Sequence, residues 1–143
     1  MNINELEKKH NARKITGHVS AMMRMSLADF PFKSYFLHGN INDELRYIQA
    51  SSENSEYILF FIPKSWGLGE HDLTAGSNII RFEPGMGLPN DPEWWYAQRG
   101  KLFITDISET SFSGNFSCYR HTDNDRPALM GGTFNVNFNE MKE

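Results

Sequence analysis

Hydrophobic and polar residues alternate with a period of two along much of this chain. In ITGHVSAMMRM, residues 15–25, the odd positions are apolar or small and most even positions are polar. The stretches FSGNFSCYRH, residues 112–121, and GGTFNVNFN, residues 131–139, alternate in the same way. This period is typical of a strand with one buried face. All three segments are therefore predicted to be strands, and the last two to share one apolar face.

Four further strands are predicted between stretches rich in Gly, Pro, Asn, Asp and Ser, at residues 35–41, 45–51, 57–62 and 77–83. The segment YILFFI, residues 57–62, is apolar at every position, which predicts a central strand. Roughly eight strands with almost no helix predict an all-β fold, either an antiparallel β-sandwich or a closed β-barrel. A single sheet of this size would expose one face and two edges.

The N-terminal residues 1–14 are predicted to form a short helix or a flexible tail, and residues 15–143 a single all-β domain. Asn4 is the expected N-cap, because acidic residues follow it in the first turn and basic residues end the segment. The apolar face consists only of Ile3 and Leu6. Because so little area can be buried, a docked helix and a frayed tail both remain open.

Length and composition indicate one ordinary globular domain, since 143 residues with 39% hydrophobic and 13% aromatic content can build a continuous core. The net charge of −4 disfavours a nucleic-acid partner, which requires a basic field. The charge is uneven, because nine acids and three bases lie in residues 43–93. Such an acidic region is able to steer a basic protein partner.

No secretion signal or membrane anchor is expected, since the N-terminus lacks an apolar run and the longest apolar stretch, residues 57–63, is too short to span a bilayer. Cys118 is the only cysteine, so no intrachain disulfide is expected and a cytoplasmic location is the simplest interpretation. Cys118 has the parity of Phe112 and Phe116, which predicts a buried thiol rather than a reactive one.

The stretch GKLFITDISETSFSGNFSCY, followed by GGTFNVNF, resembles the closing meander of small bacterial all-β proteins of uncharacterised function. The resemblance covers residues 100–138, and ITGHVSA, residues 15–21, is similar to the first strand of such proteins. It implies an all-β fold. These proteins have no shared catalytic residues to carry over to this chain.

Motifs of catalysis and of metal or cofactor binding are missing from the sequence. It lacks a Gly-x-Ser-x-Gly nucleophile elbow and a phosphate-binding Gly-rich loop, and its five His residues are scattered. His121, Asp123 and Asp125 have the spacing of a calcium loop without its Gly and distal Glu, so a turn capped by Asx side chains is the better interpretation. No metal and no cofactor are expected.

The remaining candidates for function are side chains with an apolar body and a polar tip, near predicted loops: Trp66, Trp94, Trp95, Tyr119, His121 and Arg99. They favour a non-catalytic binding module for a carbohydrate or small amphipathic ligand. In NDPEWWYAQRG, residues 90–100, alternation sends Trp94 and Tyr96 to one side and Trp95 to the other. We expect Trp95 to face outward, unless a bulge at Gly100 exchanges the sides, while core positions for the Trp residues remain the alternative.

Two other functions stay open. One is a protein-interaction role, as in an immunity or inhibitor protein that uses the acidic region against a basic partner. The other is a small hydrolase that uses His71 or His121 with nearby acids. Homo-oligomerisation through an unpaired sheet edge also stays open.

Overall fold

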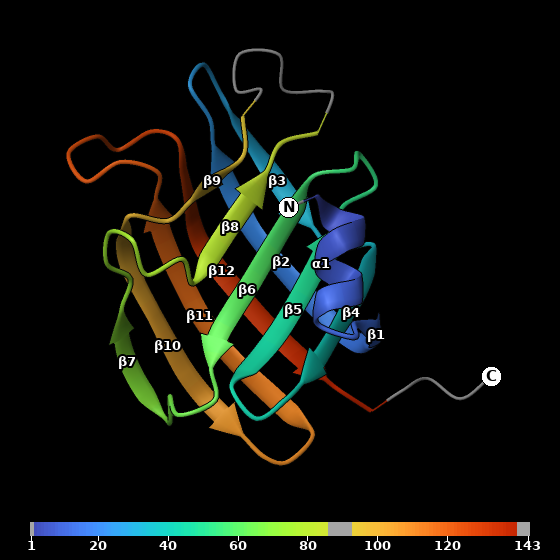
Figure 1. The fold of residues 1–143 in the computed structure, drawn as a ribbon. Coiled ribbons are helices and arrows are strands. Elements are labelled where there is room, and N and C mark those ends of the chain that lie inside the picture. Colours follow the sequence, from blue (N-terminus) through green and yellow to red (C-terminus); the bar gives the residue numbers. More distant parts are fainter. Residues whose placement is uncertain (1, 86–92, 140–143) are drawn as a thin grey trace.

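Two antiparallel sheets and one helix make up the protein, shown by a computed structural model that describes residues 2–85 and 93–139 (Figure 1). The helix is α1 (Ile3–Lys9). The sheet beneath it, here the helix-side sheet, has the order β1 (Arg13–Lys14), β4 (Phe36–Ile41), β5 (Leu45–Ser51), β6 (Tyr57–Pro63), β8 (Ile80–Glu83), β9 (Trp95–Tyr96). The second sheet has the order β3 (Asp29–Lys33), β2 (Thr16–Arg24), β12 (Ala128–Asn137), β11 (Ser111–Tyr119), β10 (Arg99–Ile107), β7 (Gly69–Asp72).

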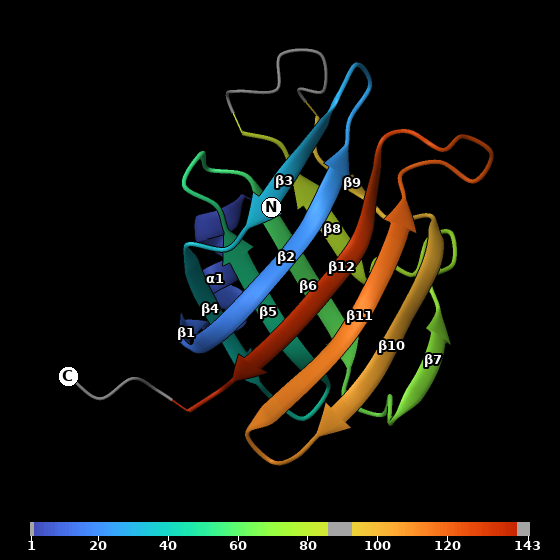
Figure 2. The same cartoon turned by 180° about the vertical axis from the view of Figure 1, so that it is seen from behind.

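The sheets face each other as a sandwich, so the expectation of an all-β sandwich is confirmed and the alternative of a closed barrel is wrong (Figures 1 and 2). The chain crosses between the sheets without a ladder that joins them. At one corner the amide of Ser34 bonds to Val19 in the second sheet, and the next amide, of Tyr35, bonds to Ser51 in the helix-side sheet. Consecutive amides thus bond to different sheets, and the strand does not continue from one sheet into the other. The edges of the two sheets therefore stay separate.

The predicted strand segments are found in the structure, and further short strands accompany them, so that twelve strands form within the described residues. The predicted segment 45–51 coincides with β5, and the segment 57–62 lies in β6, between β5 and β8. Two of the strands that the sequence pattern does not predict are β3 and β7. Each is an edge strand with neighbours on one side only, and β3 contains Pro31, a residue that edge strands tolerate.

The core lies between the inner faces of the two sheets. Phe60 of the helix-side sheet contacts Phe116 and Phe134 of the second sheet, with ring centroids 5.1 Å and 5.5 Å apart. Cys118 belongs to the same buried cluster, as its parity predicts. The polar row Ser113, Asn115 and Asn135 faces outward from the second sheet, the sheet that lies in front in Figure 2.

The helix docks on the outer face of the helix-side sheet, which settles the alternative left open above. Its N-cap is Asn2 rather than the expected Asn4, because Asn2 and Glu5 form a reciprocal capping box. Leu6 is 4% exposed and packs against Tyr47 and Leu59. Polar contacts add to this small apolar contact, since the amide of Gln49 donates to the carboxylate of Glu7 at 2.7 Å.

We predict that Leu6→Ala loosens the helix. Removing a buried leucine side chain leaves a cavity and typically costs about 2–5 kcal/mol, and we expect the lower end because α1 has few other apolar contacts. The free energy of unfolding in urea and the rate of proteolysis near residue 10 measure the effect. Lys8→Ala is the matched control, since Lys8 is exposed on the same helix. Equal stabilities of the two variants would contradict the docking role of Leu6.

We also predict that Cys118 is inert in the folded protein. Burial raises the pKa of its thiol to about 12, so the thiolate that reacts with iodoacetamide is nearly absent at about pH 8. The unfolded thiol ionises near its ordinary pKa of about 8.5, so this contribution to stability is lost as the pH rises from there towards 12. Mass spectrometry should show alkylation only after denaturation, and alkylation of the native protein would contradict the prediction.

Candidate functional site, an aromatic groove beside the helix

A groove of about 420 Å³ lies on the outer face of the helix-side sheet, beside the end of α1. We call it the aromatic groove. On the helix side it is lined by Leu6, Lys9 and His10. On the sheet side it is lined by Leu45, Phe61, Pro63, Arg81, Trp94 and Tyr96, together with residues 77–79 before β8.

Trp94 is the most exposed tryptophan of the described chain, at 49%, and it is held in place by two neighbours. The guanidinium carbon of Arg81 lies 4.1 Å from the centre of the Trp94 ring. The ring of Tyr96 meets Trp94 edge to face, with centroids 5.6 Å apart at 86°. A buried cation against one face of an indole is a favourable cation–π contact. Trp94 is therefore a positioned ring rather than a freely moving surface side chain.

Cross-strand pairing explains why these side chains meet. Arg81 in β8 stands opposite Leu59 in β6 on one side and opposite Tyr96 in β9 on the other. Opposed residues of an antiparallel pair point to the same face, so all three lie on the outer surface. Phe61 stands opposite Tyr47 in the same way. The arrangement is thus a direct consequence of register in four neighbouring strands.

Arg81 is almost wholly buried and forms an ion pair with Glu83, two residues along the same strand and on the same face. A buried cation without such a partner would be costly. The ion pair holds the guanidinium against one face of Trp94, and both Trp94 and Tyr96 line the groove. The groove is therefore lined by a cation, Arg81, that the sheet holds in a fixed position.

The end of the groove near the helix is formed by His10, which is 7% exposed and follows the last residue of α1. Its imidazole stacks on Tyr47 at 4.5 Å and meets Phe61 edge to face at 5.7 Å. Burial, and to a lesser degree the charge of Lys9, lowers the pKa of His10 below its ordinary value. The hydroxyl of Tyr47 donates a hydrogen bond to Gln49 at 2.7 Å. Gln49 in turn donates to Glu7, so the packed unit extends to the helix.

Trp95, expected to face outward, points into the core instead and is 5% exposed. Its ring packs on Phe82, with centroids 5.5 Å apart. The expected sides are exchanged because β9 belongs to the helix-side sheet and β10 to the second sheet. The amide of Ala97 bonds to Ile80, and the next amide, of Gln98, bonds to Tyr119 in the other sheet. Parity counted through this crossing does not carry over from β10 to β9.

Gly100 is not the cause of the exchange, since the β10–β11 ladder keeps its register from Arg99 to Ile104. A side chain at Gly100 would still be excluded. Its backbone has a φ of +141°, and a Cβ atom there would lie 2.2 Å from the carbonyl oxygen of Ser117. The glycine allows close strand contact near the crossing rather than a bulge.

Tyr119, Arg99 and His121 come together away from the aromatic groove, where β10 and β11 meet the loop before β12. The guanidinium carbon of Arg99 lies 3.8 Å from the centre of the Tyr119 ring. The same guanidinium donates to the carbonyl of Asn124 at 3.2 Å and to that of His121 at 3.5 Å. Because Arg99 is engaged with the loop backbone, this cluster anchors the loop.

Trp66 lies in the β6–β7 connection, at the end of the sandwich opposite the β11–β12 loop (Figure 1). Its ring stacks on His71 with centroids 4.4 Å apart and planes 5° from parallel. Nε2 of His71 is within 2.7 Å of the carbonyl oxygen of Gly67, which holds the imidazole in the loop. The six residues selected from the sequence are thus divided among the groove, the core, one loop anchor and one loop stack.

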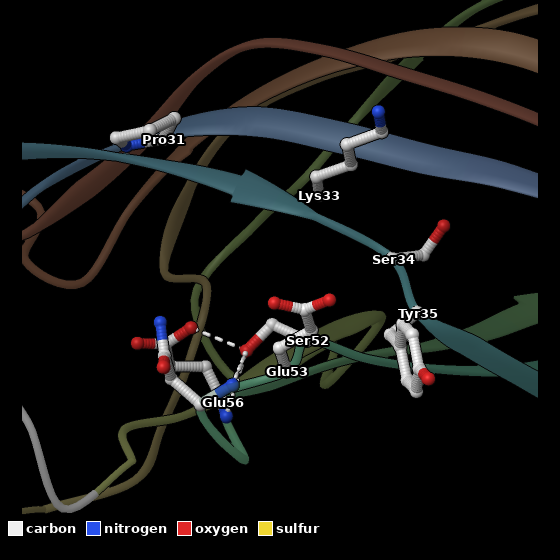
Figure 3. Close-up of a pocket in the computed structure, with 8 residues that line it drawn as sticks. Pro31, Lys33, Ser34, Tyr35, Ser52, Glu53 and Glu56 are labelled. Atoms are coloured by element: carbon white, nitrogen blue, oxygen red, sulfur yellow. Dashed lines mark hydrogen bonds between the residues drawn. The ribbon is translucent and has the colours of Figure 1, made fainter.

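A second pocket, of about 340 Å³, lies between the β3–β4 crossing and the β5–β6 turn (Figure 3). Its polar groups serve the turn. The hydroxyl of Ser52 donates to the carboxylate of Glu56 and accepts from the amides of Asn54 and Glu56. In Figure 3 the ammonium group of Lys33 points away from Ser52 and Glu56. This pocket therefore has less convergent chemistry than the aromatic groove.

The two histidines considered for hydrolysis lie apart in the fold, His71 in β7 and His121 in the loop between β11 and β12. His71 stacks on Trp66 of the β6–β7 connection, and within residues 2–85 and 93–139 no three His, Cys, Asp or Glu side chains gather to hold a metal ion. Part of the acidic region is neutralised, since Glu70 and Asp72 contact Lys101 and Glu93 contacts Arg120. Asp91, another acid of this region, lies outside the described residues. No helix in the described part of the chain is long and apolar enough to cross a membrane.

Sequence reasoning missed Phe61, Arg81, His10 and Lys9 as groove residues. The signal for Arg81 was present, because a charged residue interrupts the apolar segment IIRF and alternation sends it outward with Glu83. The contribution of Lys9 and His10 had no comparable signal, since it depends on where α1 docks.

Comparison with known proteins finds no family model, curated protein or solved structure that matches this chain.

We predict that docking of α1 weakens as the pH falls below about 6.5, the ordinary pKa of histidine. The pKa of His10 is lowered in the folded state, so the unfolded chain binds the proton first and stability falls with pH. Burial and the charge of Lys9 oppose the new charge, while Glu7 and Glu83 are engaged with Gln49 and Arg81. Urea unfolding between about pH 7.5 and 5.5 measures the loss.

The control for this prediction is His10→Gln, which cannot take up a proton in that range. We expect its free energy of unfolding to change less with pH than that of the natural protein. Identical slopes for both proteins would contradict a role for His10.

Proposed function

We propose that this protein is a non-catalytic binding module that takes a carbohydrate or another small amphipathic ligand in the aromatic groove. The observation that carries the proposal is Trp94, an indole that is half exposed yet fixed between Arg81 and Tyr96 beside a groove of about 420 Å³. Tryptophan is enriched where proteins meet their partners, because its ring offers a large apolar surface with one polar tip. A ring held rigidly loses little entropy when a ligand stacks on it.

The composition of the groove supports an amphipathic ligand. Aromatic rings offer apolar surface for the flat face of a sugar or a planar ring, and Asn78, Lys9 and the hydroxyl of Tyr96 offer polar groups at the rim. The volume is in the range of small-molecule sites. The groove thus resembles a binding surface with mixed chemistry more than a catalytic cleft with a nucleophile and its base.

We expect an aryl glycoside such as methylumbelliferyl β-glucoside to bind at Trp94, and Trp94→Ala to weaken binding about tenfold or more, because a central aromatic side chain typically contributes most to such a contact. NMR titration that follows the indole N–H signals of the three tryptophans measures the affinity and locates the ligand. The signal of Trp94 should shift, and those of Trp66 and Trp95 should not.

Trp66→Phe is the matched control, since it removes an indole that stacks on His71 and does not line the groove. It should bind the glycoside as the natural protein does. Urea unfolding of Trp94→Ala separates lost binding from lost folding. If shifts concentrate at Trp66, or if a panel of oligosaccharides, aryl glycosides and amphipathic molecules moves no indole signal, the proposal is wrong.

A further inference from the structure

We infer that the aromatic groove selects an anionic ligand, whose ring stacks on Trp94 and whose carboxylate or other negative group lies toward Lys9. This inference rests on the proposed function and adds the charge of the ligand to it. The first observation is the lining. Lys9, His10 and Arg81 line the groove, and none of its described lining residues is an acid, although the chain carries a net charge of −4.

The acids around the groove are engaged elsewhere. Glu5 belongs to the capping box at the start of α1, the carboxylate of Glu7 accepts from Gln49, and Glu83 is ion-paired with Arg81. An incoming anion therefore meets no unengaged carboxylate among these three. Lys9, exposed on the last turn of α1, is the cation best placed to approach it, and a charge-assisted hydrogen bond is stronger than a neutral one.

The C-terminal end of a helix normally repels an anion, because its last carbonyl groups carry partial negative charge. Here those carbonyls are hydrogen-bonded. The amides of His10, Ala12 and Asn11 bond to the carbonyls of Leu6, Glu7 and Lys8, and the side-chain amide of Asn40 donates to the carbonyl of His10 at 3.1 Å. The repulsion is reduced, and the positive charge of Lys9 dominates this end of the groove.

Arg81 also argues against a cationic ligand, which is the other class that aromatic sites bind. The electron-rich face of an indole attracts cations. One face of the Trp94 ring is already in contact with the guanidinium of Arg81, 4.1 Å from its centre. A second cation would have to share the ring with this guanidinium, whose charge Glu83 already balances, so the attraction for an anion at the rim comes from Lys9.

The test compares two ligands that differ in charge at one carbon, methylumbelliferyl β-glucuronide and methylumbelliferyl β-glucoside. Calorimetric titration of the full chain should give about tenfold tighter binding of the glucuronide at low salt, the factor expected of one hydrogen bond to a charged group. Raising the salt to about 300 mM should weaken the glucuronide selectively, because screening acts on the charge. Shifts at Trp94 in NMR confirm the place of binding.

Two variants complete the test. Lys9→Gln should reduce glucuronide affinity about threefold to tenfold and leave glucoside affinity within about twofold. Lys8→Gln removes the same charge from the same turn, but Lys8 does not line the groove, so it should change neither affinity. Equal loss in both variants would overturn the inference, because it would indicate a general field rather than contact with Lys9.

The outcomes separate the two proposals. If the glucoside shifts Trp94 and binds as tightly as the glucuronide, the inference about charge is wrong and the proposed function stands. Tighter binding of phenyltrimethylammonium than of the glucuronide at Trp94 would also overturn it. If none of these ligands moves the Trp94 signal, both the inference and the proposed function fail.

Discussion

Burial on both faces of β5 and β6 is the constraint on which the rest of the structure depends. Ile48 and Phe60 point to the interior between the sheets, while Tyr47 and Leu59 point to the opposite face and are also buried. Burial of apolar area drives both contacts. The second sheet covers one face and α1 covers the other. The groove exists because α1 covers only part of the outer face and stops at His10, short of β8 and β9.

Crossings between sheets decide which side chains the outer surface presents. Along the described residues the chain changes sheet at Ile15, at Ser34 and Tyr35, between β6 and β7, between β7 and β8, and at Ala97 and Gln98. After each crossing, the question of whether odd or even positions point to the interior has to be decided anew. The last crossing places Trp95 in the core and leaves Trp94 outside, in contact with Arg81. The two adjacent tryptophans therefore have different environments, one in the core and one at the surface. The crossing contributes in this way to the formation of the groove.

Electrostatics in the groove follow from the cost of burying charge. Arg81 is tolerated in the sheet because Glu83 and the face of Trp94 both stabilise it. Arg81 and Trp94 also line the sheet side of the groove, whereas Glu83 does not line it. On the helix side, burial lowers the pKa of His10, while Lys9 is exposed to water. Stability and the proposed selectivity thus use the same few side chains.

The sequence by itself determined the all-β class, the strands with clear alternation, the central place of residues 57–62 and the interior position of Cys118. These features depend on the alternation of apolar and polar residues along each strand, which is the same wherever the strand lies in the fold. The short strands β3 and β7 were missed because their pairing comes from neighbours distant in sequence. The sandwich rather than a barrel, the docked helix, the reversal of Trp94 and Trp95 and the meeting of Lys9, Arg81 and Trp94 were decided only by the tertiary structure, since each depends on how elements far apart in the chain pack together.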